Sequence, residues 1–223
     1  MTRAKTAVHK TARPAMDRRR ARTREALLSA GRALFAARGV ESVSVDEIVA
    51  AAAVAKGSFY NHFADKDVFA REIVAAVRRQ AEQAVDAANA HIEDPAEQFA
   101  RALCVFVRFA MEHPESARVL WRLNSGATMA DAPVNRGIRD IVERGIRLQR
   151  FKHVDVETGL LLVMGIVVIA LRHVLEERLT TPPKAVAKRM AAGMLRALGI
   201  SPAQAEKIAR SAAEDVLAGY ADE

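Results

Sequence analysis

The chain of 223 residues is half hydrophobic, poor in aromatic residues, and carries a formal net charge of +7. Its length allows one large or two small domains, and its composition indicates an all-α fold. The single cysteine, Cys104, excludes an internal disulfide, and the basic start lacks the apolar segment of a secretion signal. The longest apolar run, 159–171, is shorter than a bilayer span, so we expect a soluble, cytoplasmic protein.

Most of the positive charge lies at the start of the chain. Residues 1–24 contain nine arginines and lysines against Asp17 alone, a local charge of +8, which leaves about −1 for the remainder. Residues 1–16 are polar and basic without apolar periodicity, and we interpret them as a disordered basic arm. The first helix is expected from about Asp17 to Arg38.

The stretch 44–63, called the reader below, predicts two short helices joined by a tight turn. Ser44 and Glu47 have the spacing of a capping box, so the first reader helix is expected to begin at Val45. The second is expected to cover about 55–61. Two short helices with a tight turn are typical of a helix-turn-helix motif.

The second reader helix is expected to have a buried and an exposed face. Phe59 and Phe63 are four residues apart, so both should point into the core. A short helix with a small, polar, basic outer face suits the major groove of DNA, although an ordinary solvated helix has the same pattern. The side chains left on the outer face are Lys56, Ser58, Tyr60 and His62.

The remainder of the chain predicts a connecting helix and a second helical domain. Asp65 caps a helix from Lys66 that becomes polar and alanine-rich, as a connector does. The second domain covers 81–223, and Asp94 followed by Pro95 is a strong helix start. Later helices are expected at about 115–123, 133–151, 155–179, 184–198 and 202–219.

The helix predicted at 155–179 is apolar on every side between Leu160 and Leu171. A helix that is apolar all round must be covered all round. One face can pack in its own domain, and a partner subunit covers the opposite face most easily. This pattern therefore favours a homodimer.

The second domain shows no catalytic or metal-binding pattern. Cys104 has no histidine at a useful spacing, the histidines are scattered singly, and there is no phosphate loop or nucleophile elbow. We therefore expect no enzyme, no metal and no cofactor. Some large apolar side chains can line a ligand cavity or form ordinary core. These are Phe106, Phe109, Trp121, Met129 and Met164.

The segment from about Thr23 to Val77 resembles the DNA-binding half of the tetracycline-repressor (TetR) family of transcription regulators. The resemblance rests on TREALLSAGRALFAARGV, KGSFYNHF and ADKDVFAREIV, with many apolar and special positions in register. One position departs from the family, because the usual glycine of the reader turn is Ala53. If this position requires a positive φ, alanine is strained there.

The resemblance implies an N-terminal three-helix helix-turn-helix domain, 17–80, joined by a connecting helix to a helical ligand-binding and dimerisation domain. It implies a homodimer, a double-stranded DNA operator, and an unidentified small-molecule effector that releases a repressor from that operator. Lys56 would donate to guanine, while Tyr60 and Lys66 would bind phosphates. The DNA-binding positions that it implies are Thr23, Ser44, Lys56, Gly57, Ser58, Tyr60, His62 and Lys66.

Three other functions are weighed against this one. A ligand-independent architectural DNA-binding protein would share the reader but would not respond to an effector. An enzyme built on the second domain lacks a catalytic constellation. A membrane-surface protein anchored by the arm lacks apolar residues between the basic ones. The operator sequence, the effector, and repression as opposed to activation do not follow from the sequence.

Overall fold

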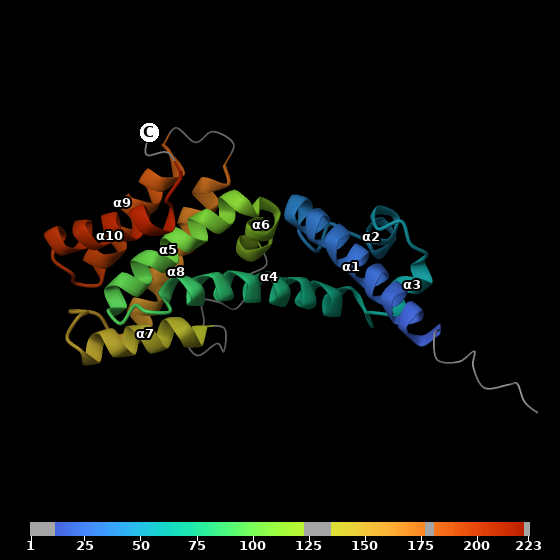
Figure 1. The fold of residues 1–223 in the computed structure, drawn as a ribbon, viewed down its shortest axis with the longest axis horizontal. Helices are drawn as coiled ribbons and strands as arrows, with labels where there is room; N and C mark the ends of the chain where they lie inside the picture. Colours follow the sequence, from blue (N-terminus) through green and yellow to red (C-terminus); the bar gives the residue numbers. More distant parts are fainter. Residues whose placement is uncertain (1–11, 123–134, 177–180, 221–223) are drawn as a thin grey trace, which may run out of the picture. The chain divides into compact units, whose positions relative to one another are not determined.

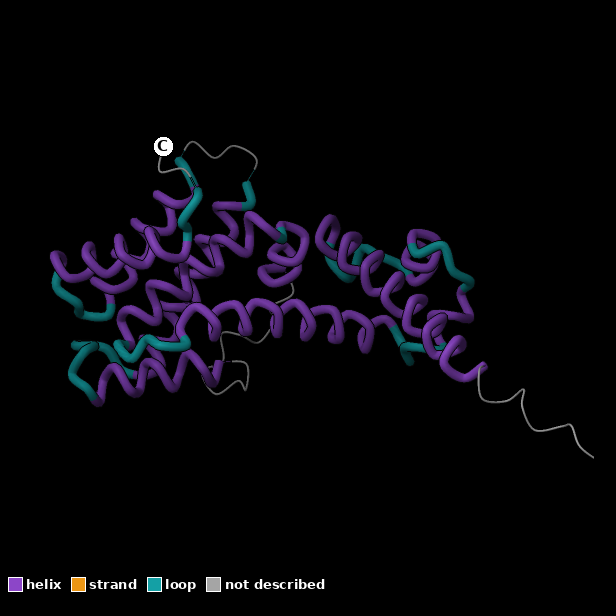
Figure 2. The backbone as a smooth tube through the Cα atoms, viewed as in Figure 1, coloured by secondary structure: helices purple, strands orange, loops and turns teal. Residues whose placement is uncertain are grey.

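The computed structural model describes residues 12–122, 135–176 and 181–220 (Figure 1). All regular structure in these ranges is α-helical, joined by loops and turns (Figure 2). The predicted all-α fold is therefore confirmed. The chain divides into two compact units, residues 1–75 and 76–223.

The first unit contains three helices and the beginning of a fourth. The first helix begins at Ala12 and not near Asp17, because Pro14 falls in the first turn, where proline is tolerated. Residues 12–16 are therefore helical, which corrects part of the predicted disordered arm, and residues 1–11 lie outside the described residues. The helices are α1 (Ala12–Arg38), α2 (Val45–Ala51), α3 (Lys56–Tyr60) and α4 (Lys66–Asn89).

A cluster of phenylalanine rings forms the core of the first unit. Phe69 of α4 lies edge-on to Phe35 of α1 and Phe59 of α3, with ring centroids 5.8 and 5.2 Å apart. Phe63 lies 4.7 Å from the same ring. Each such pair adds about 0.5–1.5 kcal/mol beyond the area that it buries. Phe59 and Phe63 are thus core residues, as predicted.

The turn between α2 and α3 uses a backbone conformation that favours glycine. Ala53 has a φ of +53°, in the left-handed region, and its N–H donates to the carbonyl oxygen of Ala50 at 3.1 Å. A left-handed conformation costs an L-residue roughly 1–2 kcal/mol. The predicted requirement for a positive φ is confirmed, and this chain meets it with a strained alanine.

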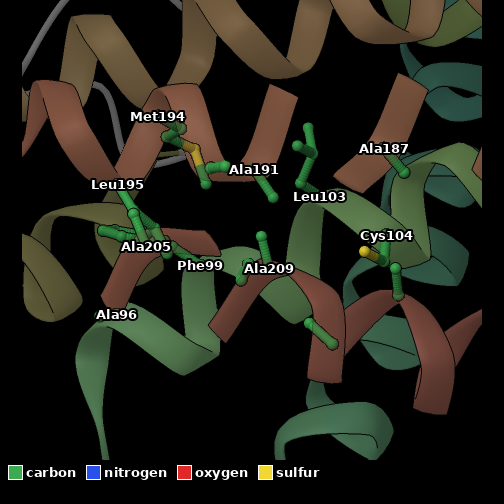
Figure 3. Close-up of a cluster of buried hydrophobic side chains, with 14 of the residues drawn as sticks. Ala96, Phe99, Leu103, Cys104, Ala187, Ala191, Met194, Leu195, Ala205 and Ala209 are labelled. Carbon is green, nitrogen blue, oxygen red and sulfur yellow. The ribbon is translucent and has the colours of Figure 1, made fainter. Parts of the chain in front are cut away.

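The second unit is built around α5, which packs against α9 and α10. Figure 3 shows small side chains such as Ala191 and Ala209 beside Leu103 and Cys104 at this contact. Burial raises the pKa of the Cys104 thiol to about 12, so the thiol stays protonated. The helices are α5 (Pro95–Glu112), α6 (Pro114–Arg122), α7 (Arg136–Arg147), α8 (Val156–Val174), α9 (Pro183–Ala197) and α10 (Pro202–Val216).

The end of α7 differs from its prediction. The helix stops at Arg147 and not near Phe151, because Gln149 adopts a φ of +54° and turns the chain back. The N–H of Phe151 then donates to the carbonyl oxygen of Gly145 at 3.0 Å. The Phe151 ring stacks on Phe99, with centroids 5.8 Å apart. The chain reversal thus places an aromatic side chain in the core of the second unit.

Helix α8 ends at Val174 and not near Leu179, and residues 177–180 lie outside the described residues. At 19 residues it is longer than the run of thirteen noted in the sequence, and by length and composition alone it is apolar enough to cross a membrane. Its buried side packs against α5 and α9. Leu161 and Ile169 remain 41% and 56% exposed. Part of the apolar surface of α8 is therefore uncovered in one chain.

Candidate functional site

The first reader helix, α2, is held by the predicted capping box. The N–H of Glu47 donates to Ser44 Oγ at 3.2 Å, and Ser44 N–H donates to Glu47 Oε2 at 2.8 Å. Glu47 also pairs with Arg38 of α1 at 2.7 Å. The hydrogen bond from the Ser44 backbone, followed by that from Arg38, lowers the pKa of Glu47 to about 2. The capping role of Ser44 is confirmed.

Two of the predicted outer-face side chains are well exposed. Lys56 is the first residue of α3, and its ammonium forms an ion pair with Asp46 of α2 at 2.7 Å. This hydrogen bond raises the pKa of Lys56. Tyr60 is 54% exposed and leans its ring edge against Phe59, 5.3 Å between centroids. Around Gly57 the space is open, since a Cβ atom there would meet nothing within 4 Å.

Ser58 and His62 are half-buried and so lie at the margin of this outer face. Burial lowers the pKa of His62, and the positive charges of Arg20 and Arg24 on α1 lower it further. A neutral imidazole is therefore favoured in the free protein. Of the four side chains predicted on the outer face, Lys56 and Tyr60 are thus exposed, whereas Ser58 and His62 are only partly accessible.

Lys66 and Thr23 have hydrogen-bond partners within the first unit that sequence reasoning missed. The half-buried Lys66 ammonium donates to the carbonyl oxygens of Val40 and Val43 at 3.1 and 3.2 Å, tying α4 to the loop before α2. Thr23 donates its hydroxyl to the carbonyl oxygen of Arg19 within α1. Because the partners of Lys66 lie more than twenty residues away, no local sequence pattern indicates them.

The second unit contains a cavity of about 440 Å³, a size typical of ligand sites. Helices α4 to α8 supply its walls, and most of the lining is apolar. Three of the predicted side chains line it, namely Phe106, Trp121 and Met164. Phe109 does not, because it is buried against His113, 5.2 Å between ring centroids. Met129 lies outside the described residues.

The α4 wall of the cavity carries charged groups that sequence reasoning missed. Arg78, Glu82 and Asp86 follow one another at four-residue intervals, so they form a single stripe along the helix. Burial lowers the pKa of Arg78, while the charge of Glu82 opposes the shift. The spacing was visible in the sequence, where this stretch was interpreted only as a polar connector. The cavity therefore has one charged wall among apolar ones.

Further polar groups lie elsewhere in the cavity. Asn135, which precedes α7, is 2% exposed and lines it together with Arg136. Two guanidinium groups lie over the Trp121 ring, that of Arg122 at 5.4 Å and that of Arg172 at 5.6 Å from the ring centroid. Such cation–π contacts attract the guanidinium groups to the ring, which also lines the cavity. The lining thus combines flat apolar surfaces with a few hydrogen-bonding groups.

Each of the two units contains a segment that matches a known protein-family model. Residues 27–73 match the family model for bacterial regulatory proteins of the tetR family, and residues 94–211 match that for the tetracyclin repressor-like C-terminal domain. The transcriptional repressor DhaR of Mycobacterium sp. (strain GP1) is 43% identical over 51 residues, 23% of this chain and 26% of that protein. The Tn10 TetC protein of Escherichia coli is 46% identical over 44 residues, 20% and 22% of the two chains. The match thus spans about a quarter of these curated relatives.

Solved structures match over most of the chain. RolR without ligand is 26% identical with a TM-score of 0.56, covering 83% of this chain and 96% of that one. Its complex with resorcinol has a TM-score of 0.57 at the same identity, covering 86% and 95%. A γ-butyrolactone receptor, 22% identical with a TM-score of 0.61 over 88% and 98% of the chains, shares the fold. Because the C-terminal family model alone covers more than half of the chain and the N-terminal model covers the reader, this protein belongs to the TetR family of bacterial transcription regulators.

Proposed function

We propose that this protein is a transcriptional repressor that binds an operator through its reader and leaves it when a small molecule occupies the cavity of the second unit. The observation that carries the proposal is the pairing of an exposed helix-turn-helix face with a ligand-sized cavity in one chain that matches both family models. The effector acts as an allosteric ligand, because it favours the conformation with weaker DNA affinity.

The proposed DNA contacts divide by type. Lys56 donates to the O6 or N7 of a guanine in the major groove, and Gly57 allows the backbone to approach closely. Tyr60 contacts a phosphate and Ser58 a phosphate or base edge beside it. Thr23 and Ser44 contact phosphates when their hydroxyls turn from Arg19 and Glu47 to the DNA. His62 contacts the DNA phosphate backbone, and so does the third N–H of Lys66, which Val40 and Val43 leave available. Such contacts position the reader without specifying sequence. The exposed arginines of α1 and the basic start of the chain supply the long-range attraction to DNA.

The proposed effector is amphipathic. An apolar body, flat enough to lie against Phe106 and Trp121, fits the apolar walls of the cavity. A polar group at one end meets the charged stripe of α4 or the buried Asn135. RolR has been solved with resorcinol, an aromatic ring with two hydroxyl groups. A hydroxylated aromatic compound is therefore a reasonable first class to test.

The proposed assembly is a cytoplasmic homodimer. Its interface uses the uncovered apolar face of α8, which includes Leu161 and Ile169, together with the adjoining face of α9. Burying such side chains contributes about 25 cal/mol for each Å² of apolar surface removed from water. Two copies of the reader would then bind successive major grooves of a two-fold symmetric operator.

The test is selection of an operator from random DNA, repeated with and without a panel of hydroxylated aromatic compounds. Enrichment of a two-fold symmetric site, and its loss in the presence of one compound, is the expected result. Enrichment that no member of a broad metabolite panel reduces would favour the ligand-independent architectural protein instead. Absence of any enriched sequence would refute the sequence-specific repressor.

A further inference from the structure

The outer face of the reader contains an acidic side chain that is paired with its own lysine. Asp46 is the second residue of α2 and Lys56 the first of α3, so the pair bridges the two reader helices. The carboxylate and ammonium lie 2.7 Å apart, and the side chains are 69% and 55% exposed. A negative charge is thus fixed on the surface that the proposed function assigns to DNA, a polyanion.

The capping box does not include this pair, and as an acid in the first turn of α2 Asp46 adds only a small stabilisation through the helix dipole. Ser44 and Glu47 complete the cap of α2, and Glu47 takes Arg38 as its ion-pair partner. Asp46 takes no part in these contacts and faces across the turn instead. An exposed ion pair contributes little to stability, because water and salt screen it. A role in ligand discrimination explains the carboxylate better.

We propose that Asp46 is a specificity-determining residue that keeps Lys56 from binding phosphates while allowing it to bind a base. The proposal rests on the proposed DNA-binding function. A lysine ammonium has three donors, so Lys56 can keep Asp46 and still donate to guanine. The carboxylate repels the guanine edge, which has no net charge, less than it repels a charged phosphate. Asp46 thus lowers affinity for wrong sites more than for the operator.

The salt dependence of binding gives this inference a direct measurement. Each phosphate that a protein neutralises releases counterions and steepens the plot of log affinity against log salt by about 0.9. A lysine neutralised by its own carboxylate contributes little to that slope. Removing the carboxylate should therefore add about one phosphate contact on DNA of any sequence.

The first experiment compares Asp46→Asn with wild type on the selected operator and on random-sequence DNA. We expect random-sequence affinity to rise about two- to fivefold, as for breaking one exposed ion pair, and the slope to steepen by about 0.9. Operator affinity should rise less, so the ratio of specific to non-specific affinity falls. If Asp46→Asn folds poorly, Asp46→Ser replaces it, because serine suits the first turn of a helix and the same changes in affinity and slope are expected.

The matched control is Glu41→Gln, which removes one negative charge from the same unit. Glu41 is exposed, and the structure gives it no ion pair within the described residues. This variant should change random-sequence and operator affinity in equal proportion. If Asp46→Asn does the same as Glu41→Gln on both DNAs, net charge explains everything and the inference is overturned.

A second experiment uses the double variant Asp46→Asn with Lys56→Met, which has the wild-type net charge. We expect wild-type affinity and slope on random-sequence DNA, together with loss of preference for the operator. A slope reduced by about 0.9 would show that Lys56 already binds a phosphate, and would overturn the inference. Failure of the wild type to select any operator refutes the proposed function instead, so the two failures are distinguishable.

Discussion

The N–H of Val54 donates to the carbonyl oxygen of Val49 at 3.0 Å, closing the C-terminus of α2 with the long-range bond of a Schellman motif. This bond requires the residue before Val54 to be left-handed, and that residue is Ala53. The reader turn is therefore built on a motif that prefers glycine at position 53, where this chain has alanine.

Replacing Ala53 by glycine should stabilise the first unit. Glycine adopts the +53° φ without steric cost, although its freer unfolded chain offsets part of the gain, so we expect about 0.5–1 kcal/mol. Chemical unfolding monitored by circular dichroism would measure it. Ala51→Gly in the last turn of α2 is the control, and should destabilise by up to about 1 kcal/mol. A lower stability for Ala53→Gly would contradict the strain.

Lys56→Ala should cost about 1–3 kcal/mol of operator affinity and relax preference at one base pair in each half-site. The reason is loss of the donor to guanine. Tyr60→Phe should instead weaken all sequences alike, since a phosphate contact carries no sequence information. Lys66→Ala is a poor comparison, because it also removes hydrogen bonds to Val40 and Val43. Operator selection with each variant distinguishes a base contact from a phosphate contact. An unchanged base preference for Lys56→Ala would exclude a role of Lys56 in specifying sequence.

Filling the cavity should abolish the response to the effector while DNA binding remains. Ala102 lines the cavity from α5, so Ala102→Phe places a ring in the space that the ligand needs. Trp121 is the only tryptophan of the chain and also lines the cavity, so its fluorescence reports occupancy. The control Ala87→Phe adds the same ring at an exposed position of α4. An effector that still releases Ala102→Phe from the operator, without a change in Trp121 emission, would place the site elsewhere.

A charge on the uncovered face of α8 should separate the proposed dimer. Ile169 is 56% exposed, and Ile169→Asp would leave an unpaired carboxylate in the interface. We expect sedimentation velocity at micromolar concentration to show monomers. The same variant should bind the operator weakly in a separate affinity measurement. Leu148→Asp is the control, because Leu148 is 61% exposed but lies just after α7. A wild-type monomer, or a dimeric Ile169→Asp protein, would refute this interface.

Stability of the first unit should fall at acidic pH through Glu47. Its pKa is lowered from 4.5 to about 2, so the folded state holds the proton less tightly than the unfolded chain. The stabilisation is therefore complete above pH 4.5 and is lost as the pH falls towards 2. Thermal unfolding of Glu47→Gln should show a smaller loss across this window than wild type. Glu41→Gln, which leaves the capping box intact, should retain the full wild-type loss.

Local signals in the sequence predicted most helix starts but few long-range contacts. The caps at Ser44, Asp65, Asp94 and Asp155 are confirmed, because a cap is decided within three residues. The predicted start of α1 near Asp17 is wrong, because the helix begins at Ala12 with Pro14 in its first turn, which accepts proline. The predicted end of α7 is wrong, because the chain turns back to stack Phe151 on Phe99, which lies 52 residues earlier in the sequence. Phe106 and Phe109 are three residues apart on α5, but only Phe106 lines the cavity, because Phe109 packs against His113.

The phenylalanine cluster of the first unit has a consequence for the timescale on which the reader opens. Helix α3 has five residues, too few to persist alone in water, and its only fully buried side chain is Phe59. The Phe59 ring contacts Phe69, which also contacts Phe35 of α1, so α3 cannot fray without disturbing the same rings. Amide hydrogen exchange in α3 should therefore proceed through cooperative opening of the whole first unit, as slowly as exchange near Phe35 in α1.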